Sequence, residues 1–419
     1  MNSKQTFRKT ALGSMLLVFL LFIGCFESVI DTLNQEKDES IVAPVDSGVP
    51  MANTKFGFNL FNAIWETEQN QNIFISPFSV STALTMTLNG AAGETEQAMV
   101  DTLQLQGIDS DSINSSYAQL QQTLQTADSK VTLTIANSLW GNEGFSFKSD
   151  FLQRNTQFFK AEISILDFLD PNSLTRINQW VNDNTNGKIP KILDEIDANA
   201  VLFLINAIYF KGAWQTEFDP MHTRDGTFHL INGSTKQVPM MFRSGRYSHY
   251  RGDAFQAVNL PYGDGRISMY IFLPARNSNL NTFLETLTPE NWENWISQFR
   301  EQELSLRIPK FKLEYGTKEL NDALTAHGMG IAFDANRADF SRMVSLEDLG
   351  ANLYIDKVSH KTFIEVNEEG TEAAAVTVVG IVKTSLPPEF TADRPFFFAI
   401  RDNQTGTVLF IGTVVDPQP

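Results

Sequence analysis

The chain has 419 residues, of which 42% are hydrophobic, and its formal net charge is −17. This hydrophobic content supports a packed core and excludes global disorder. The acidity argues against a nucleic-acid binder and against charge-driven binding to anionic lipid, because both surfaces attract basic patches. The length fits one large domain or two ordinary ones.

The N-terminus predicts export and lipid anchoring. Three basic residues precede an apolar run over residues 11–24, which is the layout of a signal peptide and is short for a membrane span. Cys25, the only cysteine, ends a Leu-x-x-Gly-Cys motif that resembles a bacterial lipoprotein cleavage site. We expect residues 1–24 to be removed and Cys25 to be acylated, placing the protein on the outer membrane or surface of a bacterial cell. A buried free cysteine is the alternative.

Residues 25–50 are predicted to form a tether between this lipid and the body of the protein. They contain several acidic residues and two prolines, with little periodic apolar pattern. From residue 51 to 419 there is no second linker, low-complexity tract or internal repeat. We therefore expect one domain over residues 51–419.

The first third of this domain is predicted to be helical. Residues 56–65 form a broad apolar helical face, and residues 79–88 follow a Ser-Pro helix start. Residues 174–183 are amphipathic and are stopped by Asn186 and the glycine after it.

Strands are predicted to dominate the later part. Apolar runs bounded by glycine, proline or polar residues occupy residues 201–210, 238–242, 257–260, 267–273 and 305–311. Residues 396–400 and 408–414 are typical of a hairpin. This order of helices and then strands favours an α+β fold over a βαβ repeat.

The sequence offers few signs of catalytic chemistry. It has no nucleophile elbow, zinc-binding helix, phosphate-binding loop or cysteine pair, and its five histidines are scattered. We therefore expect no metal, no cofactor and no catalytic residue. Arg251, Gly252 and Asp253 match an adhesion tripeptide, but so short a match favours a turn between strands.

Residues 365–388 form the most unusual segment. They are rich in β-formers and in alanine and glycine, with acidic and proline-rich ends. Such a segment could be a strand, but its alanine and glycine content makes it a poor one. A segment able to be either a loop or a strand suggests a conformational switch.

Several blocks together resemble the serpin family in their residues, order and spacing, from about residue 55 to 417. They lie at residues 72–80, 90–95, 178–193, 204–214, 238–241, 260–262, 338–341, 393–396 and 410–414. The resemblance implies an α+β serpin fold, in which a helical N-terminal part packs on a large mixed β-sheet and a reactive loop is exposed.

The resemblance also implies a monomeric suicide inhibitor of proteases. A target protease attacks the loop and is trapped as a covalent 1:1 acyl-enzyme when the cut loop inserts into the sheet. Serine proteases are the expected targets, with cysteine proteases as a second class. A non-inhibitory serpin acting as an envelope binding or adhesion module is the main alternative, and an unrecognised enzyme is the third.

The start of the unusual segment resembles the hinge of inhibitory serpins. In an inserted strand alternate side chains face opposite sides, and one face would carry only small residues. No proline interrupts the stretch. The hinge residues are Glu368, Glu369, Gly370, Thr371, Glu372, Ala373, Ala374 and Ala375.

Family spacing places the scissile bond between Thr384 and Ser385. Thr384 suits elastase-like or subtilisin-like pockets, and the neighbouring Lys383 and Val382 offer alternative bonds to trypsin-like and elastase-like proteases. We therefore expect several usable bonds and a broad specificity.

Five further residues match family positions that control insertion. Trp214 matches the breach, where insertion starts, and the residues that match the shutter beneath the sheet are Ser76, Ser79, Asn206 and His360. Buried polar side chains of these types need mutual hydrogen bonds. They are expected to gate insertion and to have no catalytic role.

Overall fold

A computed structural model describes residues 48–197, 200–344, 352–371 and 387–419. The predicted signal peptide and Cys25 lie outside these residues. Helix α2, Gly48–Glu68, begins inside the segment predicted as a tether, so the folded body starts slightly earlier than residue 51. Within the described ranges, no helix is long and apolar enough to cross a membrane.

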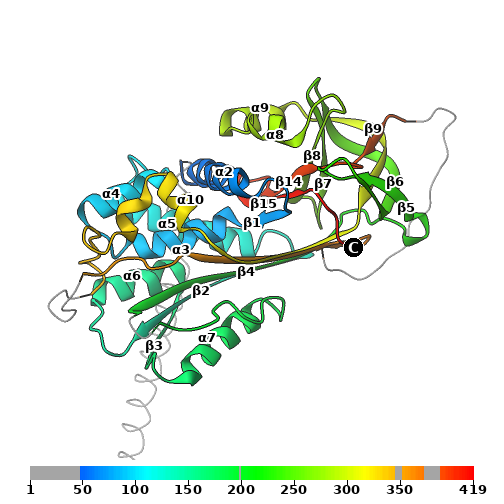
Figure 1. The fold of residues 1–419 in the computed structure, drawn as a ribbon. Helices are drawn as coiled ribbons and strands as arrows, with labels where there is room; N and C mark the ends of the chain where they lie inside the picture. Colours follow the sequence, from blue (N-terminus) through cyan, green and yellow to red (C-terminus); the bar gives the residue numbers. More distant parts are fainter. Residues whose placement is uncertain (1–47, 198–199, 345–351, 372–386) are drawn as a thin grey trace, which may run out of the picture. The chain divides into compact units, whose positions relative to one another are not determined.

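A six-stranded mixed sheet forms one half of the framework (Figure 1). Its strands, in spatial order, are β10 (Phe311–Glu319), β11 (Ser359–Val366), β12 (Gly370–Thr371), β4 (Leu202–Ala213), β2 (Val131–Asn142) and β3 (Glu162–Leu166). All neighbours are antiparallel except β2 and β3. Among the described strands, β11 and β4 are joined only through the two residues of β12. We call this interval between β11 and β4 the seam.

The second sheet has nine described strands. In spatial order they are β1 (Ile73–Ile75), β15 (Val408–Val414), β14 (Phe396–Asp402), β8 (Ile267–Pro274), β7 (Phe255–Pro261), β6 (Thr235–Arg251), β9 (Arg300–Pro309) and β13 (Glu389–Thr391), and β5 (Arg224–His229) pairs with β6. The predicted C-terminal hairpin is present as the antiparallel pair β14 and β15.

Helices cover both faces of the six-stranded sheet. Figure 1 shows α7 on one face and α3 and α5 on the other. Contacts agree, since Trp180 of α7 packs against Trp140 of β2, and Gln121 of α5 bonds Asn137 of β2. Besides α2, the described α-helices are α3 (Pro77–Leu88), α4 (Gly93–Thr102), α5 (Ser110–Gln125), α6 (Ser149–Phe159), α7 (Pro171–Asn184), α8 (Leu280–Leu284), α9 (Pro289–Ser297) and α10 (Asn321–Ala326).

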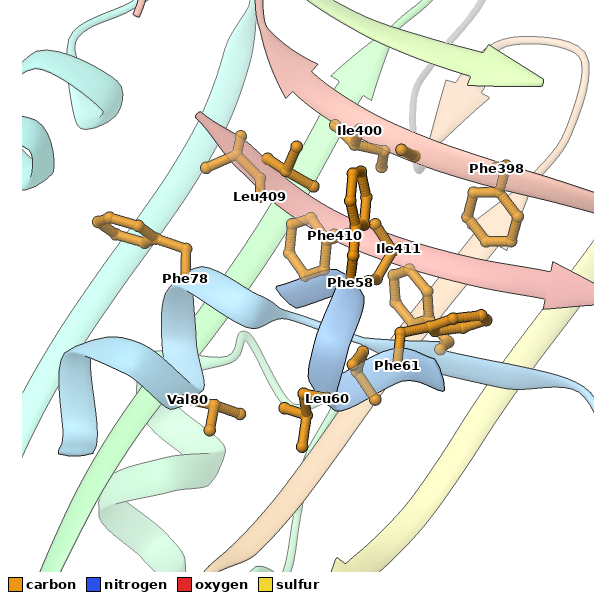
Figure 2. Close-up of a cluster of buried hydrophobic side chains, with 14 of the residues drawn as sticks. Phe58, Leu60, Phe61, Phe78, Val80, Phe398, Ile400, Leu409, Phe410 and Ile411 are labelled. Atoms are coloured by element: carbon orange, nitrogen blue, oxygen red, sulfur yellow. The ribbon is translucent and has the colours of Figure 1, made fainter. Parts of the chain in front are cut away.

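The main core lies between the helices and the second sheet. Figure 2 shows Phe58 and Phe61 of α2 close to Phe398 of β14 and Phe410 of β15, with Phe78 of α3 at the edge of the same cluster. These five side chains are almost fully buried. The core therefore joins the first helices of the domain to its last two strands.

The α+β class is confirmed, but the segregation of helices from strands was too simple. Strand β2 lies in the part predicted as helical, although Val131, Leu133 and Ile135 alternate as buried residues along it. The run predicted as one strand at 305–311 is divided between two sheets. Pro309 is the last residue of β9, the Lys310 N–H still donates to Pro239 of β6, and Phe311 changes sheet by pairing with Val366 of β11.

Candidate functional site: the seam and its gate

A tight turn carries the chain from β11 into β12. The Asn367 side-chain Oδ1 accepts the backbone N–H groups of Glu369 at 3.0 Å and Gly370 at 3.2 Å. The Asn367 N–H in turn donates to the Gly370 carbonyl at 3.0 Å. The first residues of the predicted hinge are therefore held as a closed turn at the end of the seam.

Gly370 can only be glycine in this arrangement. Its φ of +147° belongs to a region that L side chains rarely adopt, and an added Cβ would lie 2.2 Å from the Gly212 carbonyl oxygen. Thr371, the next residue, pairs with Gly212 of β4 on one side and Val366 of β11 on the other. Thr371 is thus the residue at which the chain pairs with both strands that border the seam.

Glu368 anchors the turn electrostatically. Its carboxylate accepts hydrogen bonds from Lys310 Nζ at 2.9 Å and from Thr223 Oγ1 at 2.8 Å. Burial alone would raise the pKa of Glu368, but these hydrogen bonds lower it below its ordinary value. The Glu368 backbone carbonyl also accepts the Phe218 N–H at 2.8 Å.

Trp214 holds the same turn from the end of β4. Its indole Nε1 donates to the Asn367 carbonyl at 3.0 Å, and its backbone N–H donates to the Glu369 carbonyl at 2.9 Å. The indole stacks on Tyr262, with 4.4 Å between the ring centroids. The Tyr262 hydroxyl is 2.9 Å from Thr371 Oγ1, so both rings bind the residues that begin the seam.

The four predicted shutter residues form one hydrogen-bonded network beneath the seam. The Ser76 N–H donates to His360 Nε2 of β11 at 3.0 Å, and Ser76 Oγ caps α3 by accepting the Ser79 N–H at 3.1 Å. The Ser79 hydroxyl donates to Asn206 Oδ1 of β4. The network therefore connects the two strands that border the seam.

The network continues beyond the predicted residues. Asn206 Nδ2 donates to Asn137 Oδ1 of β2 at 2.6 Å, and Asn137 Nδ2 donates to Gln121 Oε1 of α5 at 3.2 Å. Asn137 was missed because a lone asparagine in an alternating strand gives no sequence signal. Tyr262 belongs to the family block at residues 260–262, and nothing in the sequence indicates its contact with Thr371.

His360 is a neutral base in this setting. Burial lowers its pKa from 6.5 to about 4, and no hydrogen-bonded carboxylate offsets that cost among the described residues. Because Nε2 accepts the Ser76 N–H, the ring proton belongs on Nδ1. Protonation of Nε2 would direct its N–H at the Ser76 N–H, so that two donors would face each other. It would also bury a positive charge in the core.

The other predicted residues either lie outside the described ranges or do not belong to the seam. Outside the described ranges lie the later hinge residues Glu372, Ala373, Ala374 and Ala375, the bait residues Val382, Lys383, Thr384 and Ser385, and Cys25. Arg251 ends β6, and Gly252 and Asp253 lie in the turn to β7, where the Gly252 N–H donates to the Phe255 carbonyl. No cluster of metal-binding side chains occurs in the part of the chain that the structure covers.

Two mixed β-sheets, one of which carries the short strand β12 between β11 and β4, and the helices around them have the architecture of a serpin-type fold. Residues 51–417 match the family model described as serpin (serine protease inhibitor). The chain is 36% identical over 380 residues to leukocyte elastase inhibitor A of Rattus norvegicus, covering 87% of this chain and 98% of that protein. It is 37% identical over 378 residues to serpin B8 of Homo sapiens, with the same coverage.

Solved structures agree. The native-state crystal structure of the thermophilic serpin tengpin matches with a TM-score of 0.80 and 34% identity, covering 89% of this chain and 95% of that chain. The chain therefore belongs to the serpin family. Its inhibitory relatives support a role in protease inhibition rather than catalysis.

Proposed function

We propose that this protein inhibits serine proteases as a suicide substrate, trapping the acyl-enzyme as a covalent 1:1 complex when its cut loop enters the seam. The observation that carries the proposal is β12. Gly370 and Thr371 already pair within the seam and continue directly into the predicted loop. An inserting strand needs no new starting point, because its first two residues are in place.

The register of β12 defines where an inserted loop would lie. If the chain continued antiparallel to both β4 and β11 in the same register, Thr377 would lie between Asn206 and His360. The inserted strand would thus pass directly over the polar network. Insertion would also pair the backbone groups along both edges of the seam, and this pairing would favour the inserted state. The uninserted native state would then be held kinetically.

The alternation of side chains fits the same register. Thr371 contacts Tyr262 on the inner face of the sheet, so Ala373, Ala375 and Thr377 would follow it there. Their small size suits the packed interior, where a long or charged side chain would be costly to bury. Glu372 would lie on the opposite face.

We propose broad specificity through several bonds near the loop's far end. Cleavage between Thr384 and Ser385 suits elastase-like and subtilisin-like proteases, and Lys383 and Val382 offer neighbouring bonds to trypsin-like and elastase-like enzymes. Intact-mass analysis of complexes with elastase and trypsin would test this. One cleavage site shared by both proteases would refute the multi-bond prediction.

A denaturing gel after incubation with elastase, subtilisin or trypsin tests the inhibitory mechanism. The proposal expects a covalent band at the summed mass. Cleavage without such a band would support the non-inhibitory alternative, and hydrolysis of other proteins without consumption of this one would support an enzyme.

Two matched variants test the seam itself. Ala375→Arg places a charge on the predicted inner face and should convert the inhibitor into a substrate that is cleaved without complex formation. Glu372→Arg changes a charge on the opposite face and should retain the complex. Equal complex yields from both variants would contradict insertion in the β12 register.

We also propose that acylated Cys25 anchors the protein to the bacterial cell envelope, where it protects against foreign proteases. The signal-peptide layout and the Leu-x-x-Gly-Cys motif support this. Expression with a labelled fatty acid should label the wild-type protein, and a Cys25→Ser variant should be unlabelled and released from membranes. A labelled Cys25→Ser protein would refute the assignment.

A further inference from the structure

We infer that a pocket behind the hinge turn binds a small organic anion, with an oxyanion headgroup on a hydroxylated body. The pocket has a volume of about 310 Å³ and lies between the end of β4 and strands β6, β7 and β8. This volume is at the lower end of ligand pockets, about 300–1,000 Å³, so a compact molecule fits best.

Two arginines give the pocket its charge. Arg243 and Arg246 line it from β6, and Glu301 is the carboxylate among its lining residues. Arg243 donates to two uncharged oxygens, the Tyr247 hydroxyl and the Glu217 carbonyl, and Arg246 lies opposite Glu303 of β9 in the strand pair. In a chain whose net charge is −17, two such arginines in one concave site favour an anionic ligand.

Arg243 is held in place before any ligand arrives. Its Nε donates to the Tyr247 hydroxyl at 2.7 Å, and its guanidinium lies over the rings of Phe218 at 5.2 Å and Tyr247 at 4.9 Å. Nη1 donates a longer bond of 3.4 Å to the Glu217 carbonyl. Nη2 makes no hydrogen bond to another described residue and remains a donor for an oxyanion. A preorganised guanidinium of this kind loses little entropy on binding.

The rest of the lining suits a hydroxylated body. Ser248 and Ser268 contribute hydroxyls, and Asn259 and Gln215 contribute amides. Ser268 Oγ is buried and accepts a bond from Asn403 Nδ2 at 2.9 Å, so Ser248 and the two amides are the groups offered to a ligand. Such groups match hydroxyls on a ligand better than they match an apolar ring.

The pocket is coupled to the hinge through shared residues. Trp214 and Phe218 line it, and their backbone N–H groups donate to the carbonyls of Glu369 and Glu368. A ligand that packs against these residues should stabilise the uncleaved protein and protect both N–H groups from exchange. This coupling does not require that the protein inhibits a protease.

Gluconate is a suitable probe because sorbitol supplies the same hydroxylated chain without a carboxylate, and inorganic phosphate tests the headgroup alone. Calorimetry should detect gluconate binding to the uncleaved mature protein, with sorbitol at least about 10-fold weaker. Hydrogen exchange of the peptide containing Trp214 and Phe218 should slow with gluconate.

Arg246→Gln should weaken gluconate binding about 10-fold or more, and the exposed Arg251→Gln, outside the pocket on the same strand, should leave it unchanged. Because Arg246 is exposed, its loss should not unfold the protein. Equal binding of gluconate and sorbitol, or equal gluconate affinity in both variants, would overturn the proposal. Binding that leaves exchange at Trp214 and Phe218 unchanged would overturn the coupling to the hinge.

Discussion

Acid should weaken the native fold through His360. The folded protein holds this side chain neutral with a pKa of about 4, whereas the unfolded chain protonates it near 6.5. The unfolded state therefore binds more protons between these values, so stability falls as the pH falls from 6.5 to 4. A difference of this size corresponds to about 3 kcal/mol at its full extent.

A His360→Asn variant isolates this effect, because asparagine can accept the Ser76 N–H but does not titrate. Urea unfolding followed by tryptophan fluorescence should be measured at intervals from pH 7.5 to 4. The wild-type midpoint should fall more steeply than that of the variant. At pH 7 the variant should insert its loop or polymerise faster on heating, because the native packing of the gate is disturbed.

The exposed His229 provides the control, since His229→Asn should follow the wild-type profile. Comparing profiles rather than absolute midpoints removes the contribution of the chain's many carboxylates. If wild type and His360→Asn lose stability in parallel between pH 6.5 and 4, the assigned role of His360 is wrong.

Three further changes test the hinge and the gate. Gly370→Ala should destabilise the native protein by about 1–3 kcal/mol, because its Cβ would overlap the facing carbonyl of β4, and limited proteolysis should then cut the hinge faster. Glu368→Lys should lower the unfolding midpoint by opposing Lys310, and adding Lys310→Glu should recover much of the loss; no recovery would refute the ion-pair assignment. Asn206→Leu should cost about 2–4 kcal/mol because two buried partners lose their bonds. Gln121→Leu should change stability by less than about 1 kcal/mol, since the Gln121 amide nitrogen already lacks a partner among the described residues; equal losses would contradict the network.

The sequence predicted best where a residue's chemistry and its local pattern agreed. Ser76 and Pro77 predicted the start of α3, and the structure has Ser76 as its cap. Residues 396–414 predicted a hairpin, which is present as β14 and β15. In both cases neighbouring residues supply the whole signal.

Long-range contacts could not be read in the same way. The family resemblance brought Ser76, Asn206 and His360 together, but nothing in their surroundings predicts contacts across more than 100 residues. The ion pair between Lys310 and Glu368 has no signal in the sequence, which indicates Glu368 only as a hinge residue. The change of sheet after Pro309 likewise depends on the strand with which the following residues pair, and this partner is distant in the sequence.

Under the proposed mechanism, the polar network would hold the seam closed and still let it open. Apolar side chains of similar shape would often hold two strands at least as well as buried hydrogen bonds do. A hydrogen-bonded network differs in having discrete alternative partners. An inserted strand in the β12 register would place Thr377 between His360 and Asn206. Its hydroxyl could then replace bonds that the separated strands lose. We therefore infer that these residues are polar because the seam must exchange one satisfied arrangement for another.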